Sequence, residues 1–242
     1  MERKIFLKKS LGLIGISAAV IDACKKDAAA TDTGSDTGTT TDNCVVTPTE
    51  VEGPYPYPEG EINNPLNRAD ITGGQSGVPL TLTLKVVNAN DNCTAVENAR
   101  ADIWHCNKDG YYSGYANQNS VLGNKSYLGE TWLRGYQMAD ANGAVVFTTI
   151  YPGWYSGRAT HIHFEVFVNN VLKKTSQLTF PDSVSDIVHV STLYAAHGIN
   201  PSRITEDNIF ANSATDLANE TATISGSVAD GYKASLNIGI TL

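Results

Sequence analysis

Two histidines and a tyrosine within nine positions are the residues of this chain best suited to chemistry. The tyrosine is Tyr155 and the histidines are His161 and His163, with Arg158 between them and Tyr155. The two histidines directly precede an apolar stretch at residues 164–168. Side chains alternate between the two faces of a strand, so both imidazoles should share one face. Two imidazoles on one face, with phenols nearby, can hold a metal ion.

The phenols indicate which metal to expect. Tyr155 follows a turn at residues 152–154, and Tyr111 and Tyr112 follow a glycine-containing turn that ends an earlier strand. Either Tyr111 or Tyr112 could point into a pocket at the end of the sheet. A free phenol has a pKa of about 10, but a ferric ion removes its proton because a bound cation reverses the local order of pKa values. Two histidines with two tyrosines therefore predict a ferric site, whereas the histidine pair alone would also suit zinc, copper or ferrous iron.

Length and composition fit one sizeable globular domain with a tail. The chain has 242 residues, of which 41% are hydrophobic, and a formal net charge of −8 with no basic run after the N-terminus. Nucleic-acid binding needs clustered Lys and Arg, so we do not expect it. No apolar stretch reaches the roughly 20 residues that cross a bilayer.

The first 43 residues are expected to direct export rather than to fold. Residues 1–24 combine a basic start with a short apolar stretch, which fits either the general secretory or the twin-arginine route, and end in a lipobox-like sequence. Cys24 would then carry a lipid, the only predicted link to a membrane, or cleavage near Ala23 would leave none. Residues 25–43 should form a flexible tether. We expect an exported bacterial protein that is lipid-anchored, periplasmic or extracellular.

Alternation of apolar and polar residues predicts strands through the folded domain, residues 44–242. The expected strands are 80–86, 101–104, 145–150, 164–168, 171–180 and 234–242. Asn169 and Asn170 suit a tight hairpin because Asn tolerates positive φ. The fold class is therefore all-β, a sandwich of mostly antiparallel strands with long connecting loops and one or two short helices.

Helix is expected only in two places. A segment from Asp182 or Ser183 through His197, stopped by Gly198, would carry His189 and His197 toward solvent. A further turn is expected at residues 205–211. Of the remaining polar groups, His105 should be a hydrogen-bonded structural residue. Export to an oxidising compartment would also allow one disulfide among the cysteines of the domain, whose pairing the sequence does not fix: Cys44, Cys93 and Cys106.

Several motifs, in order along the chain, resemble the intradiol ring-cleavage dioxygenases, a family that includes catechol 1,2-dioxygenases and protocatechuate 3,4-dioxygenases. The motifs are Glu52–Tyr55, Asp70–Thr72 with Gly77–Leu80, Asp102–Trp104, Gly110–Ser113, Thr149–Gly153 and Arg158–Phe164. The resemblance implies a β-sandwich with one non-haem ferric ion per chain. By position, Tyr112 and Tyr155 match the two tyrosinate ligands of the family, and His161 and His163 match its two histidine ligands.

The resemblance also implies a reaction. Both atoms of O2 would enter between the two hydroxyl-bearing carbons of a catechol, giving a cis,cis-muconate-type product without an external reductant. Arg158 and Gln177 match residues that lie beside the substrate ring and stabilise negative charge on it. Tyr155 matches the tyrosinate that leaves as the catechol binds. Short motifs around residues 104–107 and 151–155 are similar to exported members of the family.

Two other classes stay open at this point. One is a non-catalytic, ligand-binding β-sandwich lipoprotein, which would have no need of two tyrosines and two histidines at these spacings. The other is a zinc or copper enzyme that uses His161 and His163. The chain lacks the long helical N-terminal segment of catechol 1,2-dioxygenases, so we do not expect their mode of dimerisation. The preferred catechol and the oligomeric state have no signature in the sequence.

Overall fold

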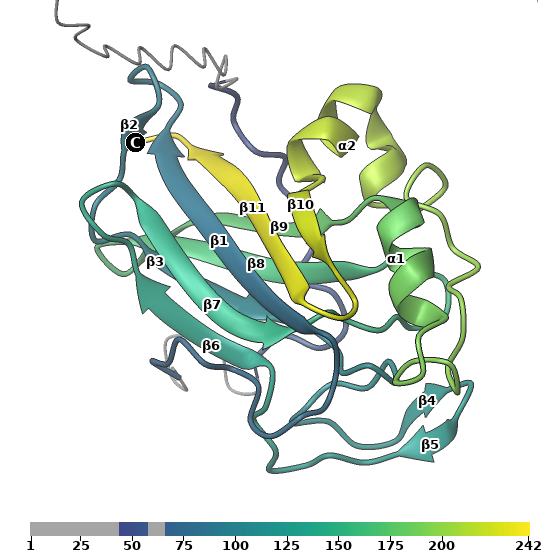
Figure 1. The fold of residues 1–242 in the computed structure, drawn as a ribbon. Coiled ribbons are helices and arrows are strands. Elements are labelled where there is room, and N and C mark those ends of the chain that lie inside the picture. Colours follow the sequence, from purple (N-terminus) through teal and green to yellow (C-terminus); the bar gives the residue numbers. More distant parts are fainter. Residues whose placement is uncertain (1–43, 58–65) are drawn as a thin grey trace, which may run out of the picture. The chain divides into compact units, whose positions relative to one another are not determined.

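The computed structural model of the chain describes residues 44–57 and 66–242 (Figure 1). The export signal and tether predicted for residues 1–43 lie outside the described residues. Two β-sheets form the sandwich, with two short α-helices beside them (Figure 1). Among the described residues, no helix is long and apolar enough to span a membrane. The predicted fold class is confirmed.

The first sheet is mixed. Its path runs β10 (Thr223–Ser227), β11 (Gly231–Ile240), β1 (Pro79–Asn88) and β2 (Thr94–Ala95), and β7 (Ala144–Ile150) also pairs with β1. β1 and β11 run parallel although about 150 positions separate them, whereas the other pairs are antiparallel. The long strand β1 is therefore the centre of this sheet.

The second sheet is antiparallel and carries the candidate site. Its order is β6 (Arg134–Met138), β3 (Arg100–Trp104), β8 (His161–Val168) and β9 (Val171–Thr179). A separate two-stranded pair, β4 (Gln118–Ser120) and β5 (Gly123–Lys125), lies in the connection between β3 and β6. The sequence pattern did not predict β6, because its five residues lack apolar alternation.

The core fills the space between the two sheets. On β1, Leu80, Leu82 and Leu84 are buried at alternate positions, and Ile162 and Phe164 of β8 are buried in the same cluster. Burying apolar surface contributes roughly 25 cal/mol per Å², so this alternation fixes which face of each strand turns inward. The face of β8 that bears the histidines must then point away from the core.

Tight turns hold the ends of the strands. Asn169 and Asn170 both have positive φ, 52° and 61°, and join β8 to β9 as the sequence predicted. Gly143, with φ of 75°, follows the Asp140 turn before β7, and the Asp140 carboxylate accepts the backbone N–H of Asn142 and Ala144. These short connections leave little freedom in the register of the strands they join.

The helices differ from the prediction. α1 spans only Asp182–His189, and the expected continuation to His197 is a series of turns. Tyr194 in that stretch is buried and binds the core: its hydroxyl donates to the Tyr151 carbonyl at 2.6 Å and accepts the Val78 N–H at 3.1 Å. These tertiary contacts of Tyr194 outweigh the local preference for a continuous helix.

Two further short helical elements follow, η1 (Phe210–Asn212) and α2 (Ala214–Glu220). The expected turn at residues 205–211 overlaps η1, but α2 was not predicted from the sequence. Ser213 caps α2 by accepting the Asp216 N–H. This Ser-x-x-Asp pattern is a local signal in the sequence for the N-terminus of a helix.

The disulfide joins Cys44 to Cys93, and Cys106 is a free, buried thiol. The bond fastens the first described residue to the turn between β1 and β2. It closes a loop of 49 residues, which in the chain-entropy description reduces the freedom of the unfolded state.

Candidate metal centre

Strand β8 brings its two histidines together. The Nε2 atoms of His161 and His163 are 3.0 Å apart, and both residues are almost fully buried. Ile162 between them belongs to the core, so the alternation of the strand places both imidazoles on the opposite face. The predicted common face of the two histidines is confirmed.

Each imidazole is fixed by its surroundings. The Nδ1 of His161 lies 2.6 Å from the Ala159 carbonyl, which requires a proton on Nδ1 and leaves the Nε2 lone pair free for the site. The His163 ring stacks on Trp104 with centroids 5.0 Å apart. At the Cε1 edge of the ring lies Gly53, which has φ of +79°, and a Cβ there would come 2.8 Å from His163 Cε1.

Burial keeps both histidines neutral. It lowers the pKa of His161 and of His163 well below the ordinary value, and the nearby Arg158 guanidinium acts in the same direction. A neutral imidazole is the form that binds metals. Nδ1 of His163 is buried and has no hydrogen-bond partner among the described residues.

Tyr112 supplies the third converging atom. Its hydroxyl lies 3.1 Å from His163 Nε2 and 3.4 Å from His161 Nε2, and its side chain is fully buried. Gln118 fixes the backbone of Tyr112 by accepting its N–H and donating to its carbonyl, each at 2.7 Å. Tyr111 instead donates to the Gly123 carbonyl, away from the histidines. Of the two adjacent tyrosines, the structure therefore brings Tyr112 to the site.

Tyr155 borders the same group from a turn rather than from a strand. Its ring centroid is 5.3 Å from that of His161 and 5.9 Å from that of Tyr112, and the residue is half-buried. Arg158 Nη1 donates to its hydroxyl at 3.3 Å. Burial raises the pKa of Tyr155 to about 12, against the opposing charge of Arg158, and also raises that of Tyr112. Both phenols therefore need a nearby cation to become phenolates at neutral pH.

Arg158 and Gln177 meet at the edge of the site. Gln177, opposite His163 in the β8–β9 register, accepts from Arg158 Nη2 at 2.7 Å and donates to the Val51 carbonyl at 2.9 Å. Arg158 is 9% exposed and Gln177 is fully buried. A buried guanidinium close to Tyr155 can stabilise negative charge that develops beside it.

Asp207 is a site residue that the sequence did not reveal. Its Oδ2 accepts from Arg158 Nε at 2.9 Å and from the Ala159 N–H at 2.6 Å, while Oδ1 accepts the Ile209 N–H at 2.9 Å. The same residue, Ala159, accepts from His161 through its carbonyl. One carboxylate thus orients both the arginine and the turn that leads into β8. No motif marked it, because it lies 49 positions after its partner Arg158 in an irregular stretch.

The other histidines are structural. His105 bridges the Cys106 carbonyl and the Thr149 hydroxyl at 2.8 and 2.7 Å, as expected. His189 and His197 are buried, so the expectation that they face solvent was wrong. His197 stacks on Trp154, with centroids 4.1 Å apart, because the chain folds back after α1 and packs on the turn that carries Tyr155.

The donor set fits a metal ion. Two imidazole lone-pair atoms and one phenol oxygen lie within 3.0–3.4 Å of one another, with a second phenol beside them. Among the described residues, no three His, Cys, Asp or Glu side chains are grouped to bind a metal. A centre at this place would therefore use phenol oxygens, the hard anionic donors that favour a trivalent ion.

Fold and candidate site together are those of a β-sandwich enzyme, and comparison with known proteins gives its family. A family model described as "Dioxygenase" matches residues 51–219. The chain belongs to this family, the intradiol ring-cleavage dioxygenases, which are oxidoreductases that cleave catechol-type rings. A non-catalytic binding module is thereby excluded.

Solved structures of dioxygenases are similar to this chain. An intradiol ring-cleavage dioxygenase from Tetranychus urticae is 29% identical, with a TM-score of 0.71 over 82% of this chain and 95% of that one. The dioxygenase domain of a carbohydrate-binding fusion protein from Streptomyces sp. SirexAA-E is 23% identical, with a TM-score of 0.58 over 82% and 99% of the two chains. Catechol 1,2-dioxygenase from Pseudomonas arvilla C-1 is 20% identical, with a TM-score of 0.51 over 81% and 62%. The last two similarities concern the fold alone.

Proposed function

We propose that the protein is an exported, non-haem Fe(III) intradiol dioxygenase that converts catechols and O2 to cis,cis-muconate-type products. The observation that carries this proposal is the convergence of the Tyr112 hydroxyl on the Nε2 atoms of His161 and His163 at 3.1–3.4 Å, beside Tyr155. These four side chains would hold one ferric ion. The bound ion would supply the Lewis acidity that keeps a catechol deprotonated and makes its ring reactive toward O2.

The chain's own residues would bind, orient and neutralise the substrate. Tyr155, which would be a phenolate while it holds the ion, would accept a substrate proton on leaving it, and Arg158 would then hold the resulting hydroxyl in the contact seen at 3.3 Å. The guanidinium would also offset negative charge on the substrate ring. Gln177 would keep one face of Arg158 directed toward the ring by accepting from Nη2. Since Asp207 accepts a hydrogen bond from Nε of the same arginine, the guanidinium has little freedom to rotate.

Two features support export. The Cys44–Cys93 disulfide is typical of oxidising compartments. The first 24 residues carry the features of a signal with a lipobox-like end at Cys24. A protein exported in this way would meet catechols derived from plant phenolics or lignin.

The test uses the full-length protein, purified without added metal. We expect close to one iron per chain, a red to burgundy colour from phenolate-to-ferric charge transfer, and oxygen uptake equal to the catechol consumed. With ¹⁸O2, both atoms should appear in the ring-opened product. The panel should include catechol, protocatechuate, hydroxyquinol and caffeoyl-type catechols. Mass spectrometry of the mature N-terminus should show a lipid-bearing Cys24.

Three outcomes would contradict the proposal. Full activity in a colourless, iron-free preparation would remove the ferric centre. Cleavage beside, rather than between, the two hydroxyl-bearing carbons would change the reaction type. An intact N-terminus beginning at Met1 after expression in a bacterial host with a complete lipoprotein pathway would remove the export proposal and leave the enzyme assignment unaffected.

A further inference from the structure

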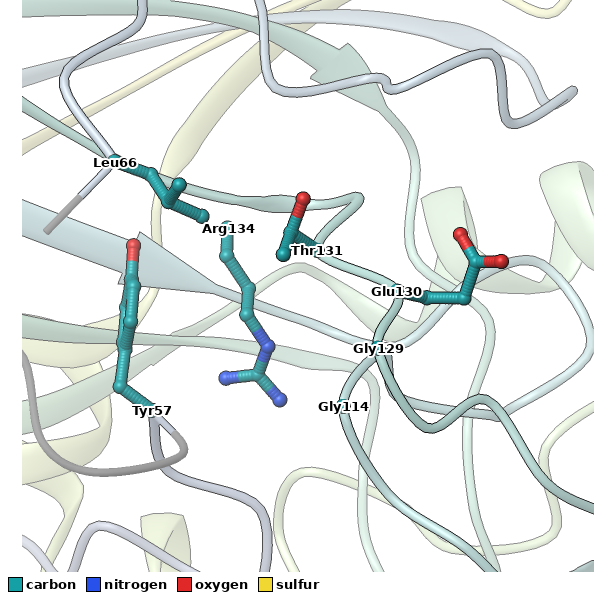
Figure 2. Close-up of a pocket in the computed structure, with 7 residues that line it drawn as sticks. All are labelled: Tyr57, Leu66, Gly114, Gly129, Glu130, Thr131 and Arg134. Carbon is teal, nitrogen blue, oxygen red and sulfur yellow. The ribbon is translucent and has the colours of Figure 1, made fainter. Parts of the chain in front are cut away.

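Arg134, the first residue of β6, is a buried cation that the roles above leave unused. Its side chain is 1% exposed, and its guanidinium carbon lies 5.5, 6.0 and 5.6 Å from the ring centroids of Tyr57, Tyr112 and Tyr115. Figure 2 shows the side chain beside the Tyr57 ring. Both residues line a cavity of about 180 Å³ that also reaches Thr131. One of the three surrounding rings is thus that of a candidate metal ligand.

The guanidinium joins two segments that are far apart in the sequence. It donates to Ser113 twice, from Nε to the hydroxyl at 3.0 Å and from Nη2 to the carbonyl at 2.9 Å. It also donates to the carbonyls of Pro56 and Tyr55 at 3.0 and 3.1 Å. Ser113 directly follows Tyr112, so this one side chain holds the backbone of Tyr55 and Pro56 against the backbone of a candidate ligand.

Residues 51–57, which we name the covering segment, lie over the metal centre. The Tyr55 ring stacks on the Tyr112 ring with centroids 4.7 Å apart, and Gly53 packs against His163. Val51 accepts from Gln177. Arg134 ties the far end of this segment, at Tyr55 and Pro56, to the loop of Tyr112, together with Tyr115, whose hydroxyl donates to the Pro56 carbonyl at 2.7 Å.

We propose that Arg134 is a positioning residue of this active site: it clamps the covering segment onto the Tyr112 loop, keeps Tyr55 stacked on Tyr112, and places positive charge beside the Tyr112 ring. Its effect on the centre rests on the proposed function, but the clamp is a property of the metal-free chain. A planar guanidinium can donate hydrogen bonds to acceptors on two segments at once, whereas a lysine ammonium is a compact point charge. Lysine at this position would keep the charge and lose the clamp.

Cys106 offers a built-in reporter of the clamp. The free thiol is 1% exposed and packs in one cluster with Tyr57, Trp104 and Tyr112, against Tyr55. A thiol reagent should reach it only when this cluster opens, so its labelling rate measures how often the covering segment lifts. The rate at Cys106 itself can be read by peptide mass spectrometry in the full-length, metal-free protein.

The experiment compares Arg134→Lys, Arg134→Met and Ser113→Ala with the wild type. We expect labelling at Cys106 to accelerate about tenfold or more in both Arg134 variants, because hydrogen bonds to a charged group are among the stronger ones. Ser113→Ala, which removes one acceptor, should give a smaller increase and keeps the proposal testable if an Arg134 variant fails to fold. Arg203→Met is the control. Arg203 pairs with Asp186 near the protein surface, so its loss should leave the labelling rate within about twofold.

The iron-loaded enzyme supplies the second readout. Arg134→Lys should raise KM for catechol more than it lowers kcat and keep the visible band near its wild-type position, whereas Arg134→Met should also shift the band. Unchanged Cys106 labelling in folded Arg134 and Ser113 variants would overturn the clamp, and an identical band in the Lys and Met variants would overturn the effect of the charge. Accelerated labelling in a protein that binds no iron would leave the clamp standing and remove the proposed function instead.

Discussion

The two candidate tyrosine ligands are held in different ways. Tyr112 is fully buried, its backbone is fixed on both sides by Gln118, and its hydroxyl lies within 3.4 Å of both histidine Nε2 atoms. Tyr155 is half-buried, lies on a turn that ends at Gly157 with φ of +85°, and directs its hydroxyl to Arg158. In the proposed centre, this difference suits Tyr112 as a permanent ligand and Tyr155 as the ligand that leaves when a substrate binds.

The two arginines beside these tyrosines are also held in different ways. Arg158 is oriented by the charge of the Asp207 carboxylate, at 2.9 Å. Arg134 donates to the carbonyls of Tyr55 and Pro56 and to both oxygens of Ser113. The half-buried tyrosine is therefore accompanied by a guanidinium held by a carboxylate, and the fully buried tyrosine by one held mainly by backbone carbonyls. Variants of these residues and their partners test whether the two tyrosines differ in function as they differ in their surroundings.

The largest expected effect separates the two tyrosines. Tyr112→Phe should lose most of its iron and lower kcat/KM by more than about 100-fold, since even losing a residue that only orients a ligand costs about 10–100-fold. Tyr155→Phe should retain more iron, shift the visible band and lower kcat. Iron content, absorption spectra and oxygen uptake measure the two together.

Tyr111→Phe is the matched control for both tyrosines, because its hydroxyl donates to the Gly123 carbonyl outside the site. Its iron content and spectrum should stay at wild-type values. Equal loss of iron in Tyr112→Phe and Tyr155→Phe would break the comparison between a fixed and an exchangeable ligand.

The next effect concerns the charge that holds Arg158. Asp207→Asn should lower the free energy of unfolding by about 3–5 kcal/mol, because it leaves a buried guanidinium without its carboxylate. It should also lower kcat, because asparagine has one acceptor oxygen and cannot serve both the Arg158 and Ala159 donors and the Ile209 N–H. Asp186→Asn is the control. It breaks the exposed pair with Arg203, and should cost about 0–1 kcal/mol by urea unfolding.

If the two Asp variants unfold with the same midpoint, the Arg158–Asp207 pair is not the buried anchor inferred here. If Asp207→Asn is destabilised but keeps the wild-type kcat, the pair stabilises the fold without positioning Arg158 for catalysis.

The smallest effect uses a second buried carboxylate as a contrast to Asp207. Hydrogen bonds from Arg158 and Ala159 keep the pKa of Asp207 low despite burial, whereas burial raises the pKa of Glu220 to about 8. Because the folded pKa of Glu220 lies above its unfolded value, the folded state binds the extra proton, and stability should fall as pH rises from about 4.5 to 8. Glu220→Gln should remove this slope and exceed the wild type by about 2 kcal/mol at pH 8.

Urea unfolding at pH 5 and pH 8 measures this difference. Glu206→Gln, at an exposed position, is the control and should leave the pH dependence unchanged. A Glu220→Gln variant with the same slope as the wild type would show that Glu220 is ionised without cost in the folded protein.

Local patterns in the sequence predicted the parts of this protein that depend on periodicity. Alternation located the strands that became β1, β3, β7, β8, β9 and β11, and it placed His161 and His163 on one face because side-chain direction along a strand repeats every two residues. The Asn169–Asn170 hairpin followed from backbone preferences of single residues. The motif order carried the family, and with it the choice of Tyr112 over Tyr111.

Only the tertiary structure decided the contacts between distant segments. Asp207 meets Arg158 across 49 positions, and Arg134 meets Pro56 across 78. The sequence also did not predict the parallel pairing of β1 with β11 or the burial of His189. The physical reason is that side-chain periodicity is a property of neighbouring residues, whereas the position of a loop depends on how the whole chain packs around the core.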